Sequence, residues 1–236
     1  MANIASGNTI AEVASLIGDV ARANILSALM SGRALTAGEL ARHAGVTAQT
    51  TSGHLAKLTG AELIVLEKQG RHRYYRLASQ EVAEAMQALM ALAAAGPARH
   101  RPIGPRDEAL RRARTCYDHI AGRLALAIAD ALSEQGYLAL GDGAALVTDE
   151  GKRFFADLGI DLMAGHSKRP LCRTCLDWSE RRPHVAGQLG AALLNRLLER
   201  EWIVRQPDSR ALKITAEGRQ GLTTTFQLQP DWWKGS

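Results

Sequence analysis

Apolar positions in residues 36–77 recur first with a helical period and then with a strand period, a pattern that predicts two helices followed by a hairpin. In the first helix, Leu40 and Ala41 face inward. Gly45 supplies the turn, because glycine can adopt the positive φ that ends a helix. Thr47 has an N-cap side chain and begins the second helix. The order of these elements predicts a helix-turn-helix.

The second predicted helix has an apolar and a polar face. Leu55 and Leu58 are spaced to enter the core. Its exposed start and flank carry hydrogen-bonding groups and one cation, contributed by Thr47, Gln49, Thr50, Thr51, Ser52, His54 and Lys57. Such a surface fits the major groove of double-stranded DNA, where short polar groups meet base edges. We therefore expect these residues to contact DNA.

A basic hairpin follows, with strands that read L-I-V-L-E and R-Y-Y-R-L around a bend at residues 68–71. Glycine at position 70 favours this turn. Four cations and no acid occur from Lys68 to Arg76. The hairpin is therefore suited to the phosphate backbone or the minor groove. We expect the wing contacts to come from Arg71, His72, Arg73 and Tyr74.

Three segments carry a resemblance to a known family: D-V-A-R-A-N-I-L-S-A-L at 19–29, L-A-R-H-A-G-V-T-A-Q-T-T-S-G-H-L-A-K-L at 40–58 and G-R-H-R-Y-Y-R-L at 70–77. In these segments the chain resembles the ArsR/SmtB family of bacterial winged-helix repressors, over about residues 8–95. The resemblance implies a winged helix-turn-helix that binds an inverted-repeat operator as a homodimer. The alternative is a winged helix kept for protein interaction, which the basic wing and the polar helix face disfavour.

Residues 81–95, E-V-A-E-A-M-Q-A-L-M-A-L-A-A-A, predict an amphipathic helix. Its apolar stripe consists of Val82, Ala85, Met86, Leu89, Met90 and Ala93. In the resembled family, the last helix of the winged domain pairs with the first helix, here about residues 10–17, to form the dimer. The resemblance therefore implies that these two helices form the homodimer interface.

A length of 236 residues predicts two domains. We expect a winged helix-turn-helix domain for DNA binding and dimerisation at 1–95, a proline- and arginine-rich linker at 96–106, and a sensory domain at 107–236. The net charge of +5 is concentrated near the linker, since residues 96–114 carry six Lys or Arg against two acids. These cations either contact phosphate or remain solvated.

The location of the protein is indicated by what its sequence lacks. No apolar run reaches the length of a membrane span, and the N-terminus has no basic region followed by an apolar one. Three cysteines fit a reducing compartment better than a disulfide framework. We therefore expect a cytoplasmic protein with no membrane partner.

The second half contains an internal repeat, over residues 116–155 and 175–222. Each copy reads as a helix, two short strands and a helix with a threonine cap. We therefore expect a mainly α protein with small β wings (α+β), whose C-terminal helical domain consists of two winged-helix-like repeats around a pseudo-twofold axis. The matching segments are C-Y-D at 116–118 and C-L-D at 175–177, H-I-A-G at 119–122 and H-V-A-G at 184–187, and T-D-E-G at 148–151 and T-A-E-G at 215–218.

Some members of the resembled family bind metal through cysteines in the helix before the recognition helix, and others through histidines and acids on the last helix of the winged domain. Here residues 39–44 contain no cysteine and residues 81–95 no histidine. Neither C-terminal repeat has an obvious polar recognition helix. We therefore expect a small-molecule or metal inducer to act on the C-terminal domain.

The candidate sensing residues are Cys116, His119, Cys172, Cys175 and His184. The spacings Cys116-x-x-His119 and Cys172-x-x-Cys175 put each pair on one helical face or turn, and together they could complete a tetrahedral site for zinc or another thiophilic ion. The repeat supports a competing set, because it equates Cys116 with Cys175 and His119 with His184. Reactive thiols and inert packing of buried cysteine are the remaining interpretations.

These patterns together predict a sequence-specific DNA-binding transcriptional regulator that is not an enzyme. We expect a repressor that leaves its operator when the C-terminal domain senses a ligand, a metal or a thiol modification. The alternative is a thiol- or zinc-dependent enzyme fused to a DNA-binding module. The sequence shows no Ser-His-Asp pattern, phosphate loop or H-E-x-x-H motif, which disfavours this alternative.

Overall fold

A computed structural model describes residues 6–96, 105–141, 144–162, 169–229 and 231–232. The chain divides into two compact units, Met1–Met86 and Gln87–Ser236. The division lies inside the helix that the sequence analysis placed at the end of the first domain. Most of the predicted linker, residues 97–104, lies outside the described residues.

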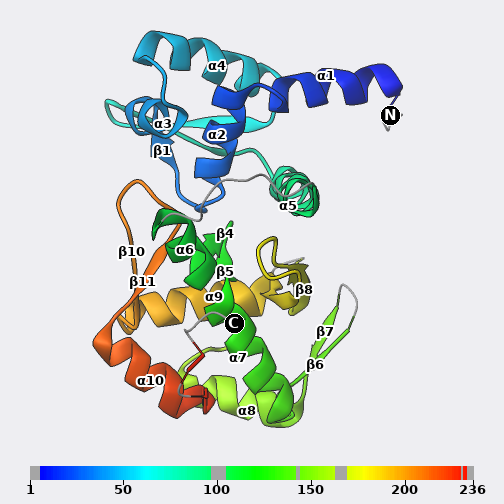
Figure 1. Cartoon of the computed structure of the whole chain (residues 1–236), viewed down its shortest axis with the longest axis vertical. Coiled ribbons are helices and arrows are strands. Elements are labelled where there is room, and N and C mark those ends of the chain that lie inside the picture. Colours follow the sequence, from blue (N-terminus) through cyan, green and yellow to red (C-terminus); the bar gives the residue numbers. More distant parts are fainter. Residues whose placement is uncertain (1–5, 97–104, 142–143, 163–168, 230, 233–236) are drawn as a thin grey trace. The chain divides into compact units, whose positions relative to one another are not determined.

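The first unit has the element order of a winged helix-turn-helix (Figure 1). Strand β3 lies between β1 and β2, and both pairings are antiparallel. The predicted helix-turn-helix and wing are therefore confirmed. Among the described residues its elements are α1 (Gly7–Ile17), α2 (Val20–Leu29), β1 (Leu35–Thr36), α3 (Ala37–Ala44), α4 (Ala48–Gly60), β2 (Ile64–Gln69), β3 (His72–Leu77) and the start of α5 (Gln80–Ala95).

Capping and turn chemistry fix the two helices of the helix-turn-helix. The side chain of Thr36 accepts a hydrogen bond from the Glu39 amide, and the Glu39 carboxylate accepts one from the Thr36 amide, forming a capping box. Gly45 ends α3 with a φ of 68°. Thr47 then caps α4 by accepting a hydrogen bond from the Thr50 amide at 3.2 Å.

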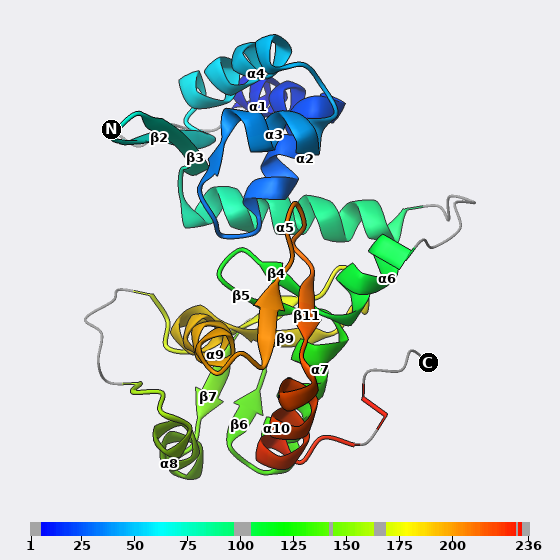
Figure 2. The same cartoon turned by 90° about the vertical axis from the view of Figure 1, so that its left-hand side faces the viewer.

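The core of the first unit lies between the helices and the hairpin. Leu40, Leu55 and Leu58 are buried, as the helical spacing predicts. Figure 2 shows the β2–β3 hairpin extending from this helical group, and its strands contact α2, α3 and α4. Burial of one face therefore holds α4 in place while its other face remains exposed.

The apolar residues of α5 have different environments. Met86 is buried, with 5% of its surface exposed, so it belongs to the core of its own chain. Leu89 and Leu92 are exposed. Helix α1 contains no buried residue, and Ile10 and Val13 on it are also exposed. Both α1 and the later part of α5 therefore carry exposed apolar side chains.

The second unit contains two copies of one element order, hairpin, helix, hairpin and helix. The predicted repeat is present, with one correction: each copy begins with a hairpin that carries the C-x-D and H-x-A-G motifs, because these residues pair across strands. After α6 (Pro105–Arg112), the first copy comprises β4 (Arg114–Cys116), β5 (His119–Ala121), α7 (Arg123–Glu134), β6 (Leu138–Leu140), β7 (Ala145–Val147) and α8 (Asp149–Leu158). The second comprises β8 (Arg173–Leu176), β9 (Pro183–Ala186), α9 (Gly187–Glu199), β10 (Ile203–Arg205), β11 (Leu212–Ile214) and α10 (Ala216–Phe226).

The two copies exchange contacts across their centre. Strand β5 packs on α9 of the other copy, β9 packs on α7, and β5 contacts β9. The buried core is continuous between the copies and includes Leu124, Phe155, Leu189 and Phe226. This reciprocal packing brings the first hairpin of each copy to the same place. None of the helices in the described ranges is both long and apolar enough to cross a lipid bilayer.

Candidate nucleic-acid interface and cysteine–histidine cluster

Helix α4 presents a polar surface at its start and along one side. Gln49, Ser52 and Lys57 are exposed. The hydroxyl groups of Thr47 and Thr50 are also exposed and lie 2.9 Å apart. This surface offers donors and acceptors of the kind that read base edges.

Two residues of the predicted DNA-reading set are placed differently. Thr51 is fully buried, and its hydroxyl donates a hydrogen bond to the Thr47 carbonyl at 2.9 Å, so it lies on the core face of α4 and not on the exposed surface where it was predicted. Nδ1 of His54 lies 3.5 Å from Nη1 of Arg22 and 3.8 Å from a carboxylate oxygen of Asp19. His54 therefore connects α4 to the capped start of α2.

The wing has an excess of positive charge that the described residues leave uncompensated. Arg76 pairs with Glu67 across the hairpin. Lys68, Arg71 and Arg73 are exposed and have no carboxylate partner within the described ranges. Lys68 also lies directly opposite Arg73 in the strand register. Like charges placed opposite one another destabilise a strand pair, so an anion at this surface would be stabilising.

The other two predicted wing residues lie beside these cations on β3. His72 is exposed and Tyr74 is half-buried. Their rings are 6.2 Å apart between centroids. The wing therefore presents both aromatic and cationic groups to solvent.

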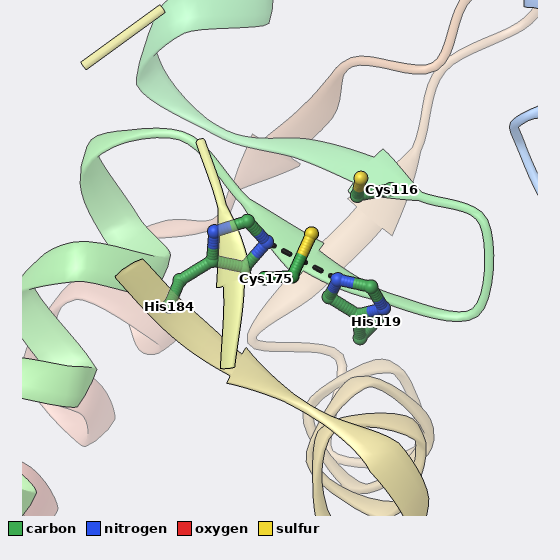
Figure 3. Close-up of side chains that lie close together, drawn as sticks. All are labelled: Cys116, His119, Cys175 and His184. Atoms are coloured by element: carbon green, nitrogen blue, oxygen red, sulfur yellow. Dashed lines mark hydrogen bonds between the residues drawn. The ribbon is translucent and has the colours of Figure 1, made fainter. Parts of the chain in front are cut away.

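The second candidate site joins the first hairpins of the two repeats. Cys116 pairs with His119 across β4 and β5, and Cys175 pairs with His184 across β8 and β9. All four side chains are buried, and one ligand atom from each lies within 4.8 Å of the others (Figure 3). We call these four residues the cysteine–histidine cluster.

This arrangement distinguishes between the two predicted sets of metal ligands. The set suggested by the repeat is brought together. The set that paired Cys172 with Cys175 on one helical face or turn is not, because Cys175 lies in strand β8 and Cys172 precedes that strand. Cys172 is buried outside the cluster. The spacing of three residues between Cys116 and His119 reflects a tight hairpin instead of a helical turn.

Hydrogen bonds orient the imidazoles of the cluster. The Nε2 atoms of His119 and His184 lie 3.1 Å apart (Figure 3). Nδ1 of His119 lies 3.2 Å from the Asp118 carboxylate, which also accepts a hydrogen bond from Arg169 at 2.6 Å. Asp118 therefore forms a hydrogen bond with Nδ1 of His119 and leaves Nε2 to face the cluster.

The buried groups also change one another's proton affinity. A hydrogen bond with Cys175 holds the pKa of the Cys116 thiol well below its usual range, although burial opposes this shift. The same bond raises the pKa of Cys175. Burial opposes protonation of His119, but hydrogen bonds with Asp118 and Cys116 raise its pKa to about 9. Burial lowers the pKa of His184. These shifts favour negative charge on Cys116 and positive charge on His119, its neighbour across the hairpin.

Helix α5 contacts this cluster through a residue that the sequence analysis did not identify. The side-chain amide of Gln87 donates a hydrogen bond to Sγ of Cys116 at 3.1 Å. Further along α5, the Ala94 carbonyl accepts a hydrogen bond from Arg181 at 2.7 Å. No sequence signal distinguished Gln87 from other polar residues of an amphipathic helix.

A buried ion pair links the two hairpins that carry the cluster. Nη2 of Arg114 on β4 lies 2.8 Å from the carboxylate of Asp177, just after β8, and both side chains are fully buried. The carboxylate also accepts a hydrogen bond from the Gly122 amide at 2.6 Å. The guanidinium lies 4.3 Å from the centre of the Trp178 ring. Arg114 was not among the predicted site residues, although R-T-C occurs in both copies, at 114–116 and 173–175.

Known proteins are similar to this chain in its helix-turn-helix and, in one case, along most of its length. Residues 17–67 match the family described as a helix-turn-helix domain. The uncharacterised HTH-type transcriptional regulator YdfF of Bacillus subtilis (strain 168) is 47% identical over 211 residues, which cover 89% of this chain and 93% of YdfF. The HTH-type transcriptional regulator CmtR of Mycobacterium tuberculosis (strain ATCC 25618 / H37Rv) is 35% identical over 79 residues, 34% of this chain and 66% of CmtR.

Among solved structures, the homodimeric winged helix-turn-helix DNA-binding domain Mb0332 of Mycobacterium bovis is 22% identical. The match covers 43% of this chain and 98% of that domain, with a TM-score of 0.36. YdfF, in contrast, is similar along both compact units. Since its similarity includes the second unit as well as the helix-turn-helix, the chain belongs to the family of HTH-type transcriptional regulators.

Proposed function

We propose that this DNA-binding regulator is a homodimeric repressor of an inverted-repeat operator, and that the state of its second unit sets its affinity for DNA. The observation that carries the proposal is the uncompensated cation group on the wing, in the same unit as the exposed polar face of α4. Phosphate contacts by the wing would position the protein, and α4 would read base edges. Gln49 and Thr50 are the exposed residues that we expect to set sequence preference.

The DNA interaction is tested by replacing both Arg71 and Arg73 with alanine. We expect weaker binding to every duplex, because phosphate contacts do not depend on base sequence. The slope of log affinity against log salt should fall by about 0.9 for each lost phosphate contact. The measurement is fluorescence anisotropy over a salt series, on a duplex selected from a random library by the wild-type protein.

A matched control replaces Lys152 and Arg153 with alanine. These residues are exposed on α8, each paired with an acid three residues earlier. The control changes the net charge by the same amount, and its salt slope should equal that of the wild type. Equal slopes for all three proteins would exclude the wing from the DNA interface.

We propose that exposed apolar side chains of α1 and of α5 take part in the dimer interface. Replacing Leu92 with aspartate would bury an unpaired charge there, which costs several kcal/mol. We expect sedimentation analysis to show a monomer, and DNA binding to weaken. Leu146→Asp is the control, since Leu146 in the second unit is 73% exposed, close to the 70% of Leu92. A Leu92→Asp variant that remains dimeric would place the interface elsewhere.

A further inference from the structure

We propose that the cysteine–histidine cluster binds one thiophilic divalent cation of the zinc class, and that Gln87 transmits its occupancy to helix α5. The metal site is inferred from the cluster alone. The effect on DNA rests on the function proposed above. The two parts are therefore tested separately.

The donor set defines the class of ligand. Two thiols and two imidazoles are the soft and borderline donors that bind zinc and related ions, usually as a tetrahedron. Hard cations such as magnesium and calcium prefer oxygen donors instead. Four protein ligands would fill a tetrahedral shell and leave no open position, as in structural and regulatory zinc sites rather than catalytic ones.

The geometry is close to what such an ion requires. With zinc–nitrogen and zinc–sulfur bonds of 2.0–2.3 Å, the ligand atoms of a tetrahedron are roughly 3.3–3.8 Å apart. The ligand atoms of the cluster already lie within 4.8 Å of one another, and the two Nε2 atoms are 3.1 Å apart. Small side-chain rotations would therefore suffice. The pairing of each cysteine with a histidine across a hairpin holds the backbone in place.

The surroundings of the cluster also fit a metal centre. Histidine ligands commonly donate a hydrogen bond from the N–H of their second ring nitrogen to a carboxylate, which fixes the tautomer and the ring orientation. Asp118 has this position against Nδ1 of His119, and Arg169 holds Asp118. Inert packing would account for buried cysteines. It does not account for two buried imidazoles that face each other at hydrogen-bond distance beside those sulfur atoms.

The coupling route begins at Gln87, whose side-chain amide donates to Cys116. A metal bound to Sγ of Cys116 would withdraw charge from the sulfur and weaken it as a hydrogen-bond acceptor. Gln87 directly follows Met86, which is buried as the last residue of the first unit. Helix α5 is continuous across this boundary, so residues of the DNA-binding unit and the residue that contacts the cluster belong to one helix.

Metal binding is tested on the reduced full-length protein, dialysed after exposure to Zn²⁺, by elemental analysis and by visible spectroscopy with Co²⁺ as a probe. We expect one ion per chain and the charge-transfer bands of tetrahedral cobalt–thiolate. Cys175→Ser and His184→Gln should each weaken binding at least as much as loss of an orienting partner, about 10- to 100-fold. Asp118→Asn should cost about 10- to 100-fold as well.

Cys172→Ser is the matched control, because Cys172 is also a buried free cysteine but lies outside the cluster. It should bind cobalt like the wild type. The wild-type spectrum does not depend on whether any variant folds. Absence of cobalt–thiolate bands in the wild type would overturn the site. So would an equal loss in Cys172→Ser and Cys175→Ser, or a cluster that only forms a Cys116–Cys175 disulfide with peroxide and binds no metal.

The coupling is tested by comparing DNA affinity of the zinc-loaded and metal-free proteins. We expect the loaded form to bind about 5- to 150-fold more weakly, the usual range for allosteric coupling. Gln87→Ala should retain cobalt binding but lose most of this difference. Metal binding with unchanged DNA affinity would overturn the coupling and leave the site. Failure of both forms to bind any duplex would overturn the proposed function and the coupling with it.

Discussion

Replacement of Asp177 by alanine is expected to lower the free energy of unfolding of the second unit by about 3–5 kcal/mol. Asp177 and Arg114 are both fully buried, at 2.8 Å from one another. Removal of the carboxylate would leave the guanidinium uncompensated in the interior. It would also leave the buried Gly122 amide without its acceptor. The expected cost therefore exceeds that of losing a single hydrogen bond.

Urea unfolding followed by circular dichroism measures this loss, with Asp130→Ala as the control. Asp130 forms an ion pair of similar length, 2.6 Å, with Arg182, but the two side chains are 42% and 56% exposed. Exposed pairs contribute about 0–1 kcal/mol. If the two alanine variants lost equal stability, the buried ion pair would stabilise the second unit no more than the exposed pair does.

The same ion pair predicts a dependence of stability on pH. Although burial opposes the shift, the Arg114 guanidinium lowers the pKa of Asp177 from 3.8 to about 2. Because the pKa of Asp177 is lower in the folded than in the unfolded state, its ionisation stabilises the fold. This stabilisation is complete above about pH 4 and is lost as the pH falls towards 2. Its size is about 2 kcal/mol. The Asp177→Ala variant should lose this part of the acid dependence.

The sequence predicted the features that depend on local chemistry. The cap at Thr47 and the turn at Gly45 follow from side chains that act on their own backbone, so neighbouring residues suffice to identify them. The burial of Thr51 could have been predicted too. Thr51 lies four residues before Leu55 and therefore on the same face of α4. Because threonine is polar, Thr51 was instead assigned to the exposed face of the helix.

Features that depend on distant pairing were harder to predict. A spacing of three residues fits both a helical turn and a tight hairpin, and only the strand pairing showed that Cys116 and His119 face each other. Tyr117 in the bend has a φ of 59°, a conformation that its residue type does not indicate. The internal repeat nevertheless identified the four residues that meet, because they occupy equivalent positions in the first hairpin of each copy and these two hairpins contact each other.

The repeated T-x-E-G motif leads to the second large effect: Gly218→Ala is expected to destabilise the second unit by about 3 kcal/mol or more. A Cβ atom at Gly218 would lie 1.9 Å from the Trp202 carbonyl oxygen, a backbone atom that a rotamer change cannot move. Thr215 binds the same turn, since its hydroxyl accepts from the Gly218 amide at 2.8 Å and donates to the Glu201 carbonyl at 2.9 Å.

The first copy has the same arrangement, because a Cβ at Gly151 would lie 2.2 Å from the Tyr137 carbonyl oxygen. Alanine should therefore destabilise the fold at either position, although alanine normally stabilises a helix relative to glycine by about 0.5–1 kcal/mol. The measurement is urea unfolding, with Thr224→Ala as the control at an exposed site of α10 that should change stability by less than about 0.5 kcal/mol. A Gly218→Ala protein as stable as the wild type would show that α10 can move off the turn at Trp202. Close packing against the backbone would then not explain why glycine occupies this position in both copies of the motif.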